Sequence, residues 1–148
     1  YTSEEVYGYL PGEKEKSVHL DKMPETVEYP DEKEVSDKFK LFFEVKDDVY
    51  KALEEARMNK IIGTGREAKV YINPSDKYNE ILGGLNKYLT QLLIVSKVEI
   101  TTEELPKYDN VQVKVEKFEG IKCQRCWVYF NEEEMQEDIC IRCHKVIS

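Results

Sequence analysis

The sequence has few cysteines and no long hydrophobic run, and each scarcity excludes a class of protein. The longest apolar stretches, such as Leu92–Val95, fall far short of the ~20 residues that a membrane-spanning helix needs. Four cysteines in 148 residues are too few for a small disulfide scaffold. The N-terminus is acidic and tyrosine-rich, without the basic start and apolar core of a secretory signal. We therefore expect a cytoplasmic protein that has no membrane partner.

Positive charge is also scarce. The chain has 22 Lys and Arg residues against 30 Asp and Glu, which gives a formal net charge of −8. This balance does not suit a protein that binds nucleic acid over its whole surface, although it leaves room for a local basic patch. Hydrophobic residues make up 41% of the chain, which is enough for a modest core in one ordinary domain or two small ones.

Familiar catalytic motifs are missing as well. The sequence contains no Ser/His/Asp set, no phosphate-binding P-loop and no glycine-rich dinucleotide fingerprint. We expect this chain to have no catalytic centre of its own.

The first 40 residues predict little packed structure. Residues 1–12 have the pattern of the last turns of a helix, which Pro11 and Gly12 end. Residues 13–38 form a charged connector that contains Pro24 and Pro30, and we expect it to be extended apart from one short apolar element at 17–20. The uncapped opening helix suggests that the body of its domain lies upstream.

The middle of the chain predicts a small α+β domain. Apolar residues at helical spacing predict a long helix from about 42 to 60, with Asp47 and Asp48 near its start, as the helix dipole favours. Period-two or β-branched patterns predict strands at 68–72, 92–101 and 111–118, and a second helical stripe runs from 78 to 89. The expected fold class is therefore α+β: a connector and helix, a β-α-β-β domain, and then a four-cysteine module. The expected domain bounds are 1–40, 41–119 and 120–148.

All four cysteines lie near the end of the chain in the pattern C-x₂-C-x₁₃-C-x₂-C. Two tight turns of this kind direct two pairs of thiolates at one ion, which predicts a single structural Zn²⁺ held by Cys123, Cys126, Cys140 and Cys143. Four protein ligands leave no open position for water or substrate, so zinc-dependent hydrolysis is not expected. Iron in a tetrahedral sulfur site, two disulfides and a redox pair are the alternatives.

Basic and aromatic residues cluster around the two cysteine pairs. Four thiolates on Zn²⁺ carry a local charge of −2, so nearby cations can simply offset that charge. They can also form a basic edge that contacts phosphate, with Trp127 as a stacking surface or, alternatively, as part of a small core. His144 follows the last cysteine but is not needed as a ligand. The candidate nucleic-acid contacts are Trp127, Arg125, Arg142, Lys122 and Lys145.

Several blocks together resemble one family. The segments Lys122-Cys-Gln-Arg-Cys-Trp127 and Cys140-Ile-Arg-Cys143 resemble the C-terminal zinc finger of bacterial isoleucyl-tRNA synthetases. Upstream, Asp48-Val-Tyr-Lys-Ala-Leu-Glu-Glu-Ala-Arg57 resembles the segment where that family leaves its anticodon-binding helical bundle, and Ser17-Val-His-Leu20 resembles the end of the bundle. Met23 and Phe39 stand where the family usually has tryptophan, and the central loop of the finger is short.

The resemblance implies a fragment of an ATP-dependent ligase that attaches isoleucine to its tRNA. The nucleotide-binding motifs and the editing domain of such an enzyme would lie upstream, and this part would help to hold the tRNA. The implied partners are tRNA(Ile) and the rest of the synthetase chain, and we expect a monomer. Two alternatives stay open: a structural zinc module that docks on the synthetase body or another protein, and a zinc finger of the DNA-repair glycosylase kind.

Overall fold

The computed structural model describes residues 1–147, which fall into two compact units that divide between Glu32 and Lys33. The first unit contains the helix α1 (Thr2–Tyr9) and the 3₁₀ turn η1 (Val18–Leu20), in agreement with the expected helix and short apolar element. The Tyr7 hydroxyl donates a hydrogen bond of 2.8 Å to Asp21, which ties the turn back to the helix. Among residues 1–147, no helix combines the length and the apolar character that crossing a bilayer requires.

The long helix begins earlier than the sequence pattern predicts. Helix α2 runs from Glu32 to Met58, so residues 32–38 are helical and not extended. These residues are almost all polar and exposed, which is why hydrophobic periodicity does not reveal them. An ion pair of 2.7 Å between Glu34 and Lys38, one turn apart, supports the added turns.

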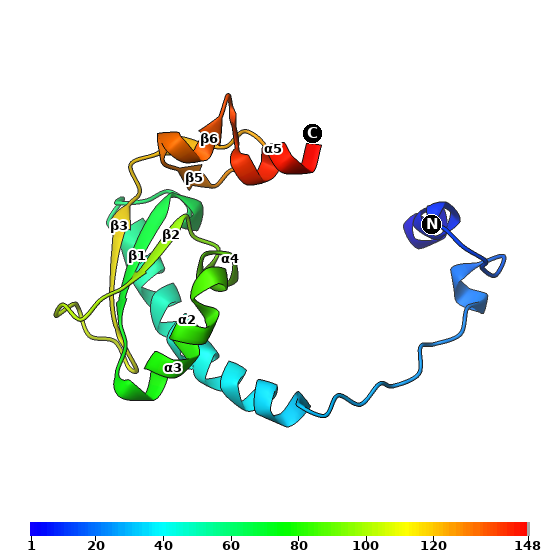
Figure 1. The fold of residues 1–148 in the computed structure, drawn as a ribbon, viewed down its shortest axis with the longest axis horizontal. Coiled ribbons are helices and arrows are strands. Elements are labelled where there is room, and N and C mark those ends of the chain that lie inside the picture. The colour runs from blue at the N-terminus through cyan, green and yellow to red at the C-terminus, as the bar shows by residue number, and fades with distance from the viewer. Residues whose placement is uncertain (148) are drawn as a thin grey trace. The chain divides into compact units, whose positions relative to one another are not determined.

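A three-stranded sheet forms the centre of the second unit (Figure 1). The central strand β1 (Ala68–Asn73) pairs in parallel with β2 (Lys97–Ile100) and antiparallel with β3 (Gln112–Lys117). Helix α3 (Asp76–Leu85), the 3₁₀ turn η3 (Asn86–Tyr88) and helix α4 (Leu89–Leu93) make the crossover that a parallel pair requires. The expected β-α-β-β order is confirmed.

One hydrophobic core joins α2, the crossover helices and one face of the sheet. Alternate residues of β1 are buried, and α2 contributes residues spaced three and four apart. The largest fully buried side chains of this core are Phe42, Val45, Val49, Val70, Ile72, Leu82, Leu89, Leu93, Val95 and Val113.

The strand predicted at 92–101 is mostly wrong. Only Lys97–Ile100 is a strand, because Leu89 and Leu93 lie one turn apart on α4 and are both buried in the core. The helix ends at Ile94, whose φ of 57° and ψ of 48° are left-handed. A β-branched residue in this conformation costs about 1–2 kcal/mol. Burial of Val95 in the core, directly after the turn, offsets this cost. The Ile94 side chain itself is 56% exposed.

Asp48 is a buried acid. It does not lie near the start of the helix, where a negative charge would interact favourably with the helix dipole as expected. Since α2 begins at Glu32, Asp48 lies in the middle of the helix, and its side chain is fully buried. Its Oδ2 accepts hydrogen bonds from the backbone N–H groups of Asn110 and Val111, at 2.6 and 3.0 Å. The Lys51 ammonium lies 3.7 Å from Oδ1. Asp48 thus fixes the start of β3 against α2.

We expect Asp48→Ala to lower the free energy of unfolding by about 2–4 kcal/mol, because two backbone amides would lose their charged acceptor. Asp47→Ala removes an exposed neighbouring acid and should change stability by less than about 0.5 kcal/mol. Urea unfolding followed by circular dichroism measures both values. Equal stability of the two variants would contradict the assigned role of Asp48.

Candidate metal centre

Residues 121–147, called the cysteine module below, follow the last strand of the sheet. Two short hairpins form it: β4 (Ile121–Lys122) pairs with β5 (Tyr129–Phe130), and β6 (Met135–Gln136) pairs with β7 (Ile139–Cys140). Helix α5 (Ile141–Ile147) closes the module. Its buried residues are Cys123, Cys140 and Cys143, so sulfur takes the place of a hydrocarbon core.

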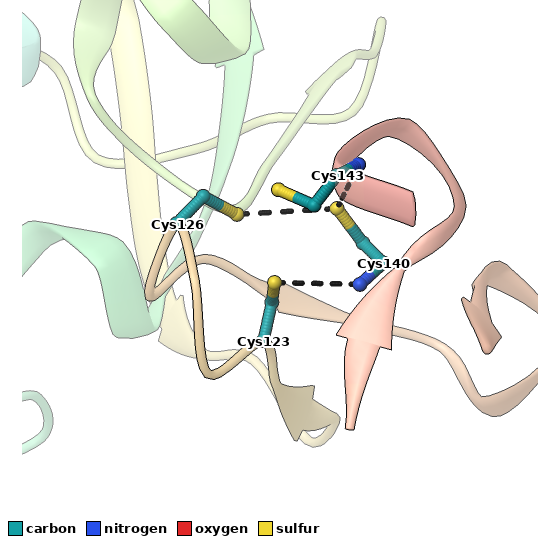
Figure 2. A group of neighbouring side chains, drawn as sticks. All are labelled: Cys123, Cys126, Cys140 and Cys143. Atoms are coloured by element: carbon teal, nitrogen blue, oxygen red, sulfur yellow. Dashed lines mark hydrogen bonds between the residues drawn. The ribbon is translucent and has the colours of Figure 1, made fainter. Parts of the chain in front are cut away.

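The four cysteines meet, as their spacing predicts. Cys123 and Cys126 come from the loop between β4 and β5. Cys140 ends β7, Cys143 lies in the first turn of α5, and the four side chains converge (Figure 2). Their sulfur atoms all lie within 4.8 Å of one another, and none of the four cysteines forms a disulfide. This group of residues could hold a metal ion, and His144 is not part of it.

The geometry of the sulfur atoms fits a tetrahedral ion. Zn–S bonds of about 2.3 Å require sulfur atoms roughly 3.8 Å apart, and the sulfur atoms of Cys126 and Cys140 are 4.0 Å apart. The backbone N–H groups of Cys140 and Cys143 donate to the sulfur atoms of Cys123 and Cys140, at 3.3 and 3.4 Å. Such donors stabilise thiolates, which are the ligands that zinc and iron accept in tetrahedral sulfur sites.

The local environment raises the pKa of two of the four thiols and lowers the pKa of the other two. Burial raises the pKa of Cys126 and Cys140. Burial also acts on Cys123, but backbone N–H donors outweigh it and lower the pKa of that thiol to about 6. The Arg125 guanidinium, 3.7 Å from the sulfur of Cys143, lowers the pKa of that thiol. A lowered pKa favours the thiolate form of Cys123 and Cys143, and the thiolate is the form that binds a metal ion.

The two arginines next to the cysteines face the sulfur atoms. Arg125 donates to the sulfur atom of Cys143. Burial lowers the pKa of Arg142, but the nearby sulfur atoms of Cys126, Cys140 and Cys143 outweigh it and hold that pKa above its usual value. This placement fits the interpretation that both cations offset thiolate charge. Lys145 is exposed on α5.

Trp127 is a surface residue and not a core residue. It follows Cys126 directly, its φ is 64°, and its side chain is 55% exposed. A left-handed position after such a turn suits glycine, so the tryptophan is held there at a conformational cost. The Lys122 ammonium lies 5.3 Å from the centre of the indole ring. Trp127 and Lys122 together present an aromatic face and a positive charge.

One serine fastens the cysteine module to the sheet. The Ser96 hydroxyl accepts a hydrogen bond of 2.9 Å from the backbone N–H of Tyr129 and donates to the carbonyl of Arg66. Gly120, between β3 and β4, lies so close to Phe118 and Phe130 that a Cβ atom there would be 2.6 Å from the Phe130 carbonyl oxygen. The module is therefore tied to the sheet on two sides.

A cavity of about 530 Å³ opens where the cysteine module meets the sheet and α2. Helix α2, the turn before β1 and the end of α4 contribute Glu54, Arg57, Gly65, Arg66, Glu67 and Ile94 to its walls, and the module contributes Lys122, Trp127 and Tyr129. The sequence patterns alone did not identify the residues outside the module, because they come from three elements that are separated in the sequence.

Comparison with known proteins finds isoleucine–tRNA ligases of several bacteria. No protein-family model matches the chain. The isoleucine–tRNA ligase of Staphylococcus carnosus strain TM300 is 43% identical over 155 residues and covers all of this chain. Those of Staphylococcus aureus strain JH9 and Bacillus cereus strain AH820 are 38% and 36% identical and cover 99% of it.

The chain matches the C-terminal region of bacterial isoleucine–tRNA ligases. It spans 17% of the length of each of these ligases. The resemblance inferred from the cysteine pairs and the upstream blocks is confirmed.

Removal of the metal should unfold the cysteine module and leave the sheet intact. We expect about one zinc ion per chain, measured by atomic emission after dialysis, and we expect a strong chelator to change Trp127 fluorescence because the module has little apolar core. Most of the circular dichroism signal should remain, since α2 and the sheet have their own core. Cys140→Ser should lose the metal without chelator. Metal-free protein with unchanged fluorescence and unchanged thermal unfolding would contradict a structural metal.

Proposed function

We propose that this chain is the tRNA-binding C-terminal part of an isoleucine–tRNA ligase, and that it positions tRNA(Ile) for ATP-dependent aminoacylation by upstream domains. The chemistry would occur elsewhere in that enzyme, since this chain would supply contacts and not reacting groups. A structural Zn²⁺ on Cys123, Cys126, Cys140 and Cys143 would hold the binding surface in shape. The names of the relatives and their match over the whole chain support this assignment.

The observation that carries the proposal is the exposure of Trp127. A large aromatic side chain, 55% exposed and left-handed in its backbone, adjoins the thiol cluster and a lysine ammonium. Aromatic stacking on an unpaired base and a nearby cation for its phosphate are the usual elements of contact with single-stranded RNA. A core or capping role would bury the indole instead.

The cations around the thiol cluster complete the proposed surface. Lys122 and Lys145 are exposed, and Arg125 and Arg142 lie beside the sulfur atoms. Contacts of this kind go mainly to phosphate, so they set the register of a bound RNA more than they read its sequence. We expect these four cations to contribute salt-dependent affinity, and Trp127 to contribute the stacking contact.

A second candidate is a purely structural module that docks on the rest of the synthetase without touching RNA. The hydrogen bond from the Tyr129 N–H to the Ser96 hydroxyl favours it, since the module already packs on its own sheet. The placement of Arg125 and Arg142 toward the thiols is also compatible with that role.

Direct binding separates the two candidates. Fluorescently labelled tRNA(Ile) is titrated with the zinc-loaded chain at two salt concentrations, and anisotropy gives the Kd. We expect saturable binding that weakens as salt rises, because cations displaced from phosphate are the main source of affinity. We expect Trp127→Ala to weaken binding by about 1–3 kcal/mol, the usual contribution of one stacked base.

Tyr88→Ala is the matched control, because Tyr88 lies in η3 and is 57% exposed, close to the value for Trp127. It should bind like the unchanged chain. Absence of binding by zinc-loaded protein would favour the docking candidate, and preference for duplex DNA in competition would favour the repair-type finger. Trp127→Ala must also keep its full zinc content, because only then does its loss of binding report a lost RNA contact and not an unfolded module.

A further inference from the structure

We propose that Cys126 and Cys140 are an oxidant-sensitive pair of thiols. A hydroperoxide oxidises the sulfur atom of Cys126 first, and Cys140 then forms a disulfide with it. The reaction withdraws two of the four candidate metal ligands, so metal binding by the cysteine module depends on redox conditions. This inference concerns the thiols alone and goes beyond the proposed binding of RNA.

Cys126 is the most accessible of the four cysteines. Cys123, Cys140 and Cys143 are buried, with at most 1% of their surface exposed, whereas Cys126 is half-buried. A second cavity, of about 460 Å³, lies between the module and the end of α4, and Cys126 is the only one of the four cysteines that lines it. Oxidation of cysteine follows exposure, so a small oxidant in this cavity meets the sulfur atom of Cys126 first.

The charge around this cavity suits a peroxide. Its charged lining residues are Arg66 and Arg142, and no aspartate or glutamate among residues 1–147 lines it. The Arg142 guanidinium also interacts with the sulfur atom of Cys126. Guanidinium groups donate strong hydrogen bonds to anions, and they can therefore stabilise the hydroxide that leaves when the O–O bond of a peroxide breaks.

Cys140 is placed to complete the disulfide. Its sulfur atom lies 4.0 Å from that of Cys126, in a contact between the two halves of the module (Figure 2). The sulfur atoms of a disulfide are about 2 Å apart, so a small movement of the two turns closes the bond. Because Cys126 and Cys140 belong to different cysteine pairs, their disulfide takes one ligand from each pair.

The reaction balances with a hydroperoxide as the only co-reactant. A metal ion keeps the cysteines that bind it deprotonated, so Cys126 reacts as a thiolate although burial raises the pKa of its free thiol. Its sulfur atom attacks one oxygen of hydrogen peroxide, the O–O bond breaks, and hydroxide leaves. The Cys140 thiolate then attacks the sulfenic acid at sulfur, the S–O bond breaks, and a second hydroxide leaves as the S–S bond forms. Two thiolates are thereby oxidised to one disulfide, and one peroxide is reduced to two hydroxide ions.

Trypsin allows this disulfide to be mapped directly. It cleaves after lysine and arginine, so Cys126 and Cys140 stay together in the peptide 126–142, and the other two cysteines leave in peptides 123–125 and 143–145. The zinc-loaded chain is treated with hydrogen peroxide, free thiols are alkylated when zinc release is first measurable, and the unreduced peptides are weighed by mass spectrometry. We expect peptide 126–142 to be unalkylated and lighter by two hydrogen atoms, and the other two peptides to be alkylated. A dithiol reductant should then restore zinc binding.

Two matched variants test which sulfur atom reacts first. Cys126→His and Cys143→His each keep three thiols and add one imidazole, a ligand set that zinc accepts in structural sites. Zinc content is measured in both before peroxide is added. We expect Cys126→His to release zinc severalfold more slowly than the unchanged chain, because the accessible sulfur atom is gone, and Cys143→His to release it at about the unchanged rate.

Each result supports or overturns the proposal. A first disulfide that joins peptide 126–142 to either of the other two peptides would overturn the pairing. Equal rates of zinc release from Cys126→His and the unchanged chain would overturn the role of Cys126, and full alkylation after peroxide treatment would overturn the proposal as a whole. If a variant does not load zinc, the peptide map of the unchanged chain decides. The tRNA affinity of the reduced chain is a separate measurement, so the proposed function can fail or stand independently.

Discussion

The hydroxyl group of Ser96 connects the cysteine module to the sheet by hydrogen bonds. This group accepts from the Tyr129 amide and donates to the Arg66 carbonyl, so one side chain connects the end of α4, the turn before β1 and the first hairpin of the module. The module that carries Trp127, the centre of the proposed RNA surface, is thereby held on the sheet.

Sulfur has two functions in the module. The four cysteines supply the candidate ligands, and three of them are also its buried residues. A module of this size cannot bury enough hydrocarbon to fold by itself, so an ion that joins its two hairpins would provide the missing stabilisation. The cations beside the sulfur atoms offset the negative charge of thiolates in an acidic chain. The cations that do not contact sulfur remain available to an anionic partner.

Sequence patterns predicted the parts of this protein whose spacing is regular. The cysteine pairs, the alternation in β1 and β3 and the apolar stripe of α2 each follow from one repeated interval. The first turns of α2 were missed because exposed charged residues carry no such interval. The strand expected at 92–101 failed because tertiary packing of Leu93 overrode β-branched propensity. The cavity was not foreseen, since its residues come from α2, the turn before β1, the end of α4 and the cysteine module.

The bond between Asp48 and the amide of Val111 also bears on how the chain matures during synthesis. Its two ends are 63 residues apart, so Asp48 gains this partner only after the chain has been synthesised as far as the start of β3. Domains generally fold in the order of their synthesis, and the sheet is complete before the second cysteine pair is made. An ion held by all four cysteines would therefore be captured only after every strand of the sheet has been made.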